Sequence, residues 1–285
     1  MPSARKITVG VLALQGAFSE HVQLLRHAAI ALKAHDSETQ FEFLEIRTPE
    51  ELRRCDALII PGGESTTISL VAARSGMLEP LREFVKVIRK PTWGTCAGLI
   101  LLAESANRTK KGGQELIGGL DVRVNRNHFG RQVESFQANI DLLFLKDSVA
   151  VSGSEASRPF RSVFIRAPVV EKILPHVEGI QAGEAEREET VVAPSKRPAD
   201  ELAKKEVKAE VEVLARLPGD ATAIKDDEKT ARAAGEGDII AVRQGNVFGT
   251  SFHPELTGDS RIHVWWLEQV VNALDRRKQQ ASKVS

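Results

Sequence analysis

The chain has 285 residues with 39 basic and 39 acidic side chains, so its formal net charge is zero. A chain of this length can bury a full core without disulfides or metal ions, and its hydrophobic fraction of 42% is ordinary for a globular protein. The neutral balance, without a basic cluster, argues against a nucleic acid as the main partner.

The two cysteines, Cys55 and Cys96, could form at most one bridge, and metal cages of the CxxC type are absent. Secreted domains usually carry more disulfides, so we predict a reducing compartment, the cytoplasm, and no metal. An apolar run over residues 7–14 is too short for a signal peptide and favours a buried strand. No other stretch approaches the ~20 apolar residues of a bilayer span, so we expect no membrane association.

The first 105 residues alternate strand-like and helix-like patterns. The strand at 7–14 is followed by apolar residues at helical spacing from Phe18 to Leu32. After a second strand, Thr48 and Pro49 open a helix that has an N-cap and a capping-box Glu51. The remaining predicted elements of this part are strands at 41–46, 57–60 and 91–95, a helix opened by the turn at 61–66, and a helix at 78–88.

Beyond Gly118 the pattern changes to shorter strands at hairpin spacing, predicted to extend the sheet in antiparallel fashion. They lie near residues 122–124, 133–137 and 163–167. The chain closes with a strand pair over 238–252 and a helix from about 259 to 278. Because strands first alternate with helices, the sequence predicts a three-layer α/β sandwich with a mixed, mainly parallel sheet flanked by helices.

A charged segment interrupts this pattern. Residues 181–238 hold 15 acidic and 10 basic side chains and no Phe, Trp or Tyr. Such a composition favours solvated, partly helical or disordered insertions, which we expect to be protease-sensitive loops. Alternating apolar residues over 211–217 indicate a genuine strand. The prediction is therefore a single domain over 1–285 with charged insertions at about 176–210 and 218–237.

The strongest local signal is Gly94-Thr-Cys96-Ala97-Gly98, between a strand and an apolar helix start. This is the nucleophile-elbow arrangement with Cys in place of Ser, and the glycines allow its tight turn. A helix N-terminus stabilises a thiolate, which makes Cys96 the candidate nucleophile. The alternative is that Cys96 is a small buried apolar residue, which is the role we predict for Cys55.

A cysteine nucleophile needs a base and an acid that orients the base. His253 and Glu255 follow an apolar strand, and in extended backbone the positions i and i+2 face the same way. Glu255 would then hold the imidazole of His253 in the useful tautomer, although a chance turn is the plain alternative. The other histidines are assigned to the surface or to partial burial rather than to catalysis; they are His21, His27, His35, His128, His176 and His263.

The glycine-rich turn Pro61-Gly62-Gly63-Glu64 precedes another predicted helix. A phosphate loop is the obvious alternative, but no Gly-Lys-Ser/Thr follows the turn. In a hydrolase such a turn presents the backbone N–H of Gly63, which can join the N–H of Ala97 in an oxyanion hole.

Several motifs together carry a family resemblance. They are Gly10-Val-Leu-Ala-Leu-Gln15-Gly16, Pro61-Gly-Gly-Glu-Ser-Thr66, Gly94-Thr-Cys96-Ala-Gly98, Arg126-Asn-His-Phe-Gly-Arg-Gln132, Phe164-Ile-Arg166-Ala-Pro168 and His253-Pro-Glu255-Leu-Thr. This set resembles the glutaminase subunits of pyridoxal 5′-phosphate synthase, which are class I, triad-type glutamine amidotransferases. The cysteine and histidine motifs indicate only the wider class, whereas the two arginine motifs are much narrower.

The resemblance implies a Cys96-His253-Glu255 triad that hydrolyses L-glutamine to L-glutamate and ammonia without a cofactor. A guanidinium can clamp the α-carboxylate of glutamine and a carboxylate can meet its α-ammonium group. Which arginine touches the substrate is left open, and for either one a surface ion pair is the alternative. The implied glutamine-binding residues are Gly62, Gly63, Glu64, Arg126, Ile165 and Arg166.

The implied partner is a (β/α)8 synthase subunit, which condenses the ammonia with ribose 5-phosphate and glyceraldehyde 3-phosphate to give pyridoxal 5′-phosphate (vitamin B6). Two other functions stay open. One is the glutaminase subunit of another amidotransferase, such as that of histidine biosynthesis. The other is a catalytically silent scaffold that binds proteins through the charged insertions. The synthase that accepts the ammonia distinguishes the first, and glutamine hydrolysis distinguishes the second.

Overall fold

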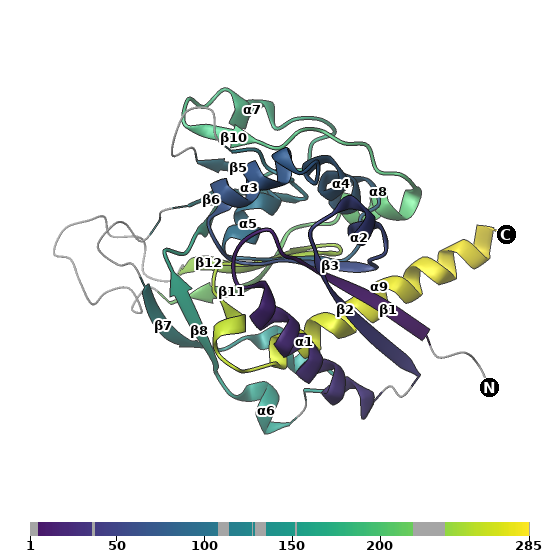
Figure 1. Cartoon of the computed structure of the whole chain (residues 1–285). Helices are drawn as coiled ribbons and strands as arrows, with labels where there is room; N and C mark the ends of the chain where they lie inside the picture. Colours follow the sequence, from purple (N-terminus) through teal and green to yellow (C-terminus); the bar gives the residue numbers. More distant parts are fainter. Residues whose placement is uncertain are drawn as a thin grey trace.

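The computed structural model describes residues 5–35, 38–107, 114–126, 128, 135–151, 153–218 and 237–284. Within these ranges the centre of the molecule is an 11-stranded mixed sheet (Figure 1). Its strands lie in the order β10 (Thr190–Val192), β5 (Ala103–Asn107), β6 (Leu120–Asn125), β9 (Val169–Ile173), β12 (Asp238–Gln244), β13 (Val247–Thr250), β4 (Thr92–Thr95), β3 (Ala57–Ile60), β1 (Arg5–Leu12) and β2 (Thr39–Ile46), and β11 (Glu212–Leu217) also pairs with β12.

The strands β13, β4, β3, β1 and β2 form a block in which all neighbours are parallel. Beyond β13 the sheet becomes mixed, since β12, β9 and β10 pair with their neighbours in antiparallel fashion while β5 and β6 are parallel. The predicted sheet is therefore confirmed. The parallel block matters most for the site, because the carboxyl ends of parallel strands meet at one edge.

Helices cover both faces of the sheet, as Figure 1 shows, which gives the predicted three layers. In β3, Ala57 and Ile59 join one buried cluster and Leu58 and Ile60 the other, as a period of two requires for a strand buried on both faces. The first cluster packs against α1 (Phe18–Lys33) and α9 (Arg261–Val284), and the second against α2 (Pro49–Arg53), α3 (Ser65–Arg74), α4 (Leu78–Arg82) and α5 (Ala97–Leu102).

Local signals explain several element boundaries. Thr48 caps α2 with the predicted capping box, in which its side chain accepts from Glu51 N and the Glu51 side chain accepts from Thr48 N. The helix predicted at 78–88 consists of α4 followed by a π-helical turn, η1 (Glu83–Val87). No helix in the described parts of the chain combines the length and apolar character that crossing a bilayer requires.

One strand prediction is wrong. The strands β7 (Ser135–Ile140) and β8 (Phe160–Ile165) do not extend the main sheet but pair with each other in a separate two-stranded sheet. The reason is aromatic packing: the rings of Phe160 and Phe164 lie 6.1 and 5.8 Å from the ring of Phe252. The hairpin thus buries its apolar face over the segment that leads to His253. Val133 lies outside the described residues.

The expectation of solvated, partly helical or disordered insertions over 181–210 is confirmed only in part, because many side chains are exposed and two short helices form, but the segment also adds a strand to the sheet. This segment forms α7 (Ala182–Ala185), the edge strand β10 and α8 (Glu201–Val207), and Ala193 and Ala203 are fully buried. One of its acidic side chains, Glu184, is buried against the sheet, where it pairs with Arg123 at 3.1 Å and accepts from Ser105 Oγ at 3.0 Å. The predicted strand at 211–217 is confirmed as β11, whereas residues 219–236 of the second charged segment lie outside the described residues.

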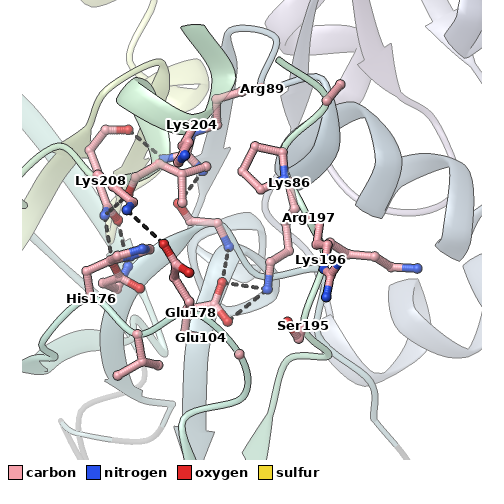
Figure 2. A pocket seen from close by; sticks show the side chains of 18 of the residues that line it. Lys86, Arg89, Glu104, His176, Glu178, Ser195, Lys196, Arg197, Lys204 and Lys208 are labelled. Carbon is pink, nitrogen blue, oxygen red and sulfur yellow. Dashed lines mark hydrogen bonds and ion pairs between the residues drawn. The ribbon is translucent and has the colours of Figure 1, made fainter. Parts of the chain in front are cut away.

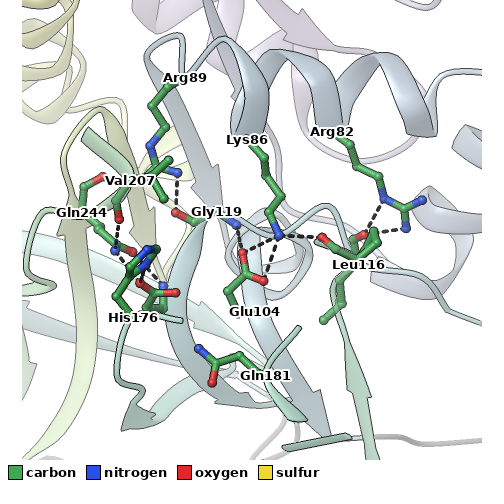
Figure 3. A network of polar contacts seen from close by, with 12 residues as sticks. Arg82, Lys86, Arg89, Glu104, Leu116, Gly119, His176, Gln181, Val207 and Gln244 are labelled. Atoms are coloured by element: carbon green, nitrogen blue, oxygen red, sulfur yellow. Dashed lines mark hydrogen bonds and ion pairs between the residues drawn. The ribbon is translucent and has the colours of Figure 1, made fainter. Parts of the chain in front are cut away.

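A cavity of about 580 Å³ lies between this segment and the sheet (Figure 2). Below it, a network of polar contacts joins Lys86, Glu104 and Gly119 to the inserted chain (Figure 3). The remaining short elements are η2 (Leu143–Asp147), α6 (Ser154–Ser157) and η4 (Pro254–Leu256).

Candidate active site

Three adjacent strands deliver the predicted site residues to one edge of the sheet. Gly62 and Gly63 follow β3, Cys96 follows β4, and His253 lies three residues beyond the end of β13. Because β13, β4 and β3 are neighbours and parallel, all three segments leave the sheet at the same edge. Segments that are far apart in the sequence therefore converge.

Cys96 occupies the turn between β4 and α5 with φ 48° and ψ −101°, a left-handed backbone rarely adopted by residues other than glycine. The glycines on either side permit this elbow. A Cβ on Gly98 would lie 2.0 Å from the carbonyl oxygen of Ile60, and one on Gly94 would lie 2.4 Å from the backbone of Gly98. The turn is therefore built as the sequence predicts, with the thiol at a helix N-terminus.

His253 and Glu255 are joined by a hydrogen bond of 2.8 Å between Nδ1 and Oε1. The predicted contact exists, but the reason given for it is wrong: the backbone is not extended, because Pro254 starts the short 3-10 helix η4 and His253 caps it. Both side chains are buried, and the His253 N–H is fixed by the carbonyl of Val163 at 2.8 Å. The β7–β8 hairpin thus holds the segment in place.

Cys96 and the His253 ring lie side by side, and their interaction is one of the causes that raise the pKa of His253. The two residues face Gly62, where an added Cβ would lie 2.3 Å from Cε1 of His253 and 3.3 Å from Cβ of Cys96. Burial disfavours charge on His253, but its interactions with Cys96 and Glu255 outweigh burial and raise its pKa to about 10. Burial also acts against the Glu255 carboxylate, but the bond and the charge of His253 hold its pKa below the usual value.

The other cysteine, Cys55, has a different environment. Cys55 lies in the core beside α2, its thiol donates to the carbonyl of Glu51 at 3.4 Å, and burial raises its pKa to about 12. A thiol of this kind stays protonated and unreactive. The prediction that Cys55 is structural is confirmed.

The two predicted oxyanion-hole residues lie at the starts of adjacent segments. Ala97 is the first residue of α5, where the N–H has no partner within the helix. Gly63 packs against the side chain of Gln15, whose Oε1 would be 2.3 Å from a Cβ at this position and accepts from Glu64 N at 2.8 Å. Gln15 therefore supports the glycine turn.

Glu64 and Arg126 meet at the start of α3. The Glu64 carboxylate caps this helix by accepting from the N–H groups of Thr66 and Thr67, and these bonds lower its pKa against the effect of burial. Arg126 is buried, and its Nη2 donates to Ser65 Oγ and Thr66 Oγ1 at 3.0 Å each and lies 3.8 Å from Glu64 Oε1. Burial lowers the pKa of Arg126, and the nearby Glu64 opposes this.

Ile165 and Arg166 approach the site from β8. The carbonyl of Ile165 lies 3.9 Å from Sγ of Cys96, which places this backbone beside the candidate nucleophile. Arg166 is exposed and has φ 42°, a strained conformation that follows the end of the strand. The structure thus brings Cys96, His253, Glu255, Gly62 and the Ile165 carbonyl together.

A profile of the SNO glutamine amidotransferase family matches residues 11–199 and 199–272. The chain belongs to this family. The probable pyridoxal 5′-phosphate synthase subunit PDX2 of Arabidopsis thaliana is 40% identical over 262 residues, covering 92% of this chain and 85% of the relative. The subunit PdxT of Streptomyces avermitilis is 41% identical over 262 residues, covering 92% and 93%. A crystal structure described as a glutamine amidotransferase matches with a TM-score of 0.56 and 35% identity, covering 92% of this chain and 98% of the other.

In this member of the glutamine amidotransferase family, two histidines that were not expected near the site lie next to the triad. His21 and His263 are fully buried and lie behind Glu255, so their assignment to the surface or to partial burial is wrong. A signal was present: His21 lies three residues after Phe18 and four before Leu25, on the apolar stripe of α1. The remaining four are exposed or partly buried as predicted; they are His27, His35, His128 and His176.

Proposed function

We propose that Cys96, His253 and Glu255 form the catalytic triad of a glutaminase that releases ammonia from L-glutamine. The observation that carries the assignment is that Cys96, on a left-handed elbow, lies beside the ring of His253, which is bonded to Glu255. Membership of the glutamine amidotransferase family supports the same reaction.

In the proposed reaction Sγ of Cys96 attacks the side-chain amide carbon of glutamine and forms a tetrahedral adduct. His253 gives its proton to the amide nitrogen, the C–N bond breaks, and ammonia leaves a thioester on Cys96. His253 then takes a proton from water, which attacks the thioester carbon and releases L-glutamate and the thiol. Glu255 stabilises the imidazolium that the cycle needs.

The surrounding residues have proposed roles in binding. The N–H groups of Gly63 and Ala97 stabilise the oxyanion of the adduct, because they belong to fixed backbone at the two turns. Glu64 and Arg126 bind the α-ammonium and α-carboxylate groups of glutamine, supported by their position together at the start of α3. Gly62, Ile165 and Arg166 complete the proposed pocket around Cys96.

The chain is a glutaminase subunit for pyridoxal 5′-phosphate synthesis, as its relatives named for that synthase indicate. We propose further that its partner is a (β/α)8 synthase subunit that receives the ammonia. A location in the cytoplasm stays a prediction, supported by the unpaired Cys55 and Cys96. We also propose one domain over 1–285, because the clusters on both faces share the same sheet.

The decisive experiment measures glutamate release with and without the purified synthase barrel. Cys96→Ala should lower the rate by about 10³-fold or more while the fold is retained, because the thiol is needed only for chemistry. Cys55→Ala is the matched control and should retain most of the activity. Wild-type turnover by Cys96→Ala would remove the nucleophile assignment, and ammonia transfer only to a cyclase of histidine biosynthesis would redirect the partner proposal. Absence of hydrolysis by the wild-type complex would favour a scaffold.

A further inference from the structure

Behind Glu255 lies a pair of fully buried histidines that the proposed reaction does not use. His21 Nε2, on α1, lies 3.3 Å from Glu255 Oε2 and 3.2 Å from Thr95 Oγ1. His21 Nδ1 lies 3.0 Å from Nε2 of His263, on α9. Trp93 covers both rings, with centroid distances of 5.5 Å to His21 and 4.9 Å to His263. The polar chain thus continues from Cys96 through the triad into the core.

Both imidazoles in this pair are neutral. Burial lowers the pKa of His21 and of His263 to about 3, and the Glu255 carboxylate only partly opposes this for His21. The charged or titratable groups that face His21 are Glu255, His263 and His253. Since the pKa of His253 is raised to about 10, the proton of this cluster lies on the triad histidine and not behind it.

The hydrogen-bond partners determine the tautomers. One of His21 Nδ1 and His263 Nε2 must donate to the other, and Nδ1 of His263 has no partner. If His263 donates through Nε2–H, its Nδ1 is a bare lone pair, which costs less when unpaired than a buried N–H. His21 Nδ1 is then the acceptor, so the hydrogen of His21 lies on Nε2, facing Glu255 Oε2 and Thr95 Oγ1.

The opposite pair of tautomers is disfavoured both at His263 and at Glu255. It would bury an unpartnered N–H on His263 and would turn the lone pair of His21 Nε2 toward the lone pairs of Glu255. Glu255 Oε2 has no partner with hydrogen-bond geometry among the described residues, and His21 Nε2, at 3.3 Å, is placed to become one. Catalytic hydrogen bonds often tighten only in the complex with substrate, so a distance of 3.3 Å is compatible with such a bond.

We propose that His21 is a positioning residue of the glutaminase, whose Nε2–H holds the second oxygen of Glu255, and that His263 fixes the tautomer of His21. This inference rests on the proposed triad and extends it inward. His21 touches no substrate and acts only through Glu255. A carboxylate held at both oxygens cannot rotate, so Oε1 stays aligned with Nδ1 of His253 while the proton moves between His253 and the substrate.

The test compares three replacements of His21. His21→Gln places an amide N–H where Nε2 stood, His21→Asn places its amide at the Nδ1 end, and His21→Leu removes both. We expect kcat for glutamine hydrolysis, with the synthase barrel present, to fall about 10- to 100-fold for His21→Leu and His21→Asn, with KM within about twofold. His21→Gln should stay within about threefold of the wild type, and His263→Gln likewise.

A second measurement tests the interaction of Cys96 with His253 without glutamine turnover. The rate of alkylation by iodoacetamide, followed against pH, reports how well His253 stabilises the reactive form of Cys96. Without a donor to its Oε2, Glu255 stabilises the His253 imidazolium less well. The pH midpoint of alkylation should therefore move upward in His21→Leu and His21→Asn, but not in His21→Gln. Cys96→Ala shows the background from Cys55, and thermal melting shows which variants are folded.

The outcomes separate the two proposals. If the wild-type complex hydrolyses no glutamine, the proposed function fails, while the alkylation midpoints still test the role of His21. If the wild type is active and all three His21 variants share its kcat and its midpoint, the residue only fills space and the inference is overturned. Equal losses in His21→Gln and His21→Asn would also overturn it, because the position of the donor would then not matter.

Discussion

Two buried polar networks lie at opposite sides of the active-site strands. They differ in how many of their polar atoms have hydrogen-bond partners. Under the segment 181–208, Lys86 Nζ contacts both oxygens of Glu104 at 2.8 and 2.9 Å and the carbonyl of Pro194 at 2.7 Å, and Glu104 also accepts from Gly119 N at 2.7 Å (Figure 3). Behind the triad, by contrast, Oε2 of Glu255 and Nδ1 of His263 have no bonded partner in the described residues.

The two networks therefore have different roles. Opposite charges in the first network satisfy each other, so it fixes the inserted segment on the sheet; within it, Arg89 leaves one nitrogen, Nε, unpartnered. The second network contains one carboxylate and three imidazoles, and its proton can move only at His253. Buried polar atoms that lack partners are costly, and they persist where chemistry uses them.

The largest expected effect is on the catalytic side. Glu255→Gln keeps the shape of the side chain but removes the charge that stabilises the His253 imidazolium, so kcat should fall about 10²- to 10⁴-fold. Binding to the synthase should change little. Glu20→Gln, on the exposed surface of α1, is the control. Unchanged kinetics in Glu255→Gln would remove the orienting role of this carboxylate.

In the network under the insertion we expect a loss of stability without a loss of activity. Lys86→Met leaves the buried Glu104 without its cation, and should lower the free energy of unfolding by about 3–5 kcal/mol, measured by urea denaturation. Glutaminase activity per folded molecule should be unchanged. The double variant Lys86→Met/Glu104→Gln should recover part of the loss, because the amide oxygen can still accept from Gly119 N. A loss of activity without a loss of stability would contradict the comparison.

The histidines make stability depend on pH in two directions. For His21 and His263 the pKa is about 3 when folded and 6.5 when unfolded, so their contribution is present above pH 6.5 and is lost as the pH falls toward 3. Each should contribute a slope of about 1.4 kcal/mol per pH unit in that window. For His253 the folded pKa is about 10, so its contribution is complete below pH 6.5 and is lost as the pH rises through 10.

Urea denaturation from pH 7 to 4 checks the acidic part of this dependence. The double variant His21→Gln/His263→Gln should have a flatter curve than the wild type, while His27→Gln, an exposed position, should not. Parallel curves for the wild type and the double variant would show that the buried pair takes up protons as readily as the unfolded chain.

The smallest effect is expected at the rim of the cavity. His176 Nδ1 lies 3.0 Å from Asp121 Oδ2, but its side chain is 27% exposed, and Gln244 Nε2 donates to the same oxygen at 2.7 Å. His176→Ala should therefore lower the free energy of unfolding by about 1 kcal/mol or less, with no change in kcat. A loss as large as that of Lys86→Met would mean that this pair belongs to the core of the network.

Much of the fold could be read from the sequence because its signals are local. The apolar strands, the capping box at Thr48 and the glycines around Cys96 act over a few residues, and each predicts its own element. The β7–β8 hairpin was misplaced because an alternating pattern shows that a strand has one buried face, but not which surface covers that face. The attachment of the charged segment to the sheet was missed because composition does not reveal partners elsewhere in the chain.

By itself, the sequence determined the residue types of the site: a cysteine between glycines, a histidine with a glutamate two residues later, and the helical stripe that carries His21. Only the tertiary structure decided that α1 and α9 pack together, so that His21 and His263 meet behind Glu255. Spacing of 3.6 residues can turn a side chain toward the interior, but which group it meets there depends on contacts between segments about 240 residues apart.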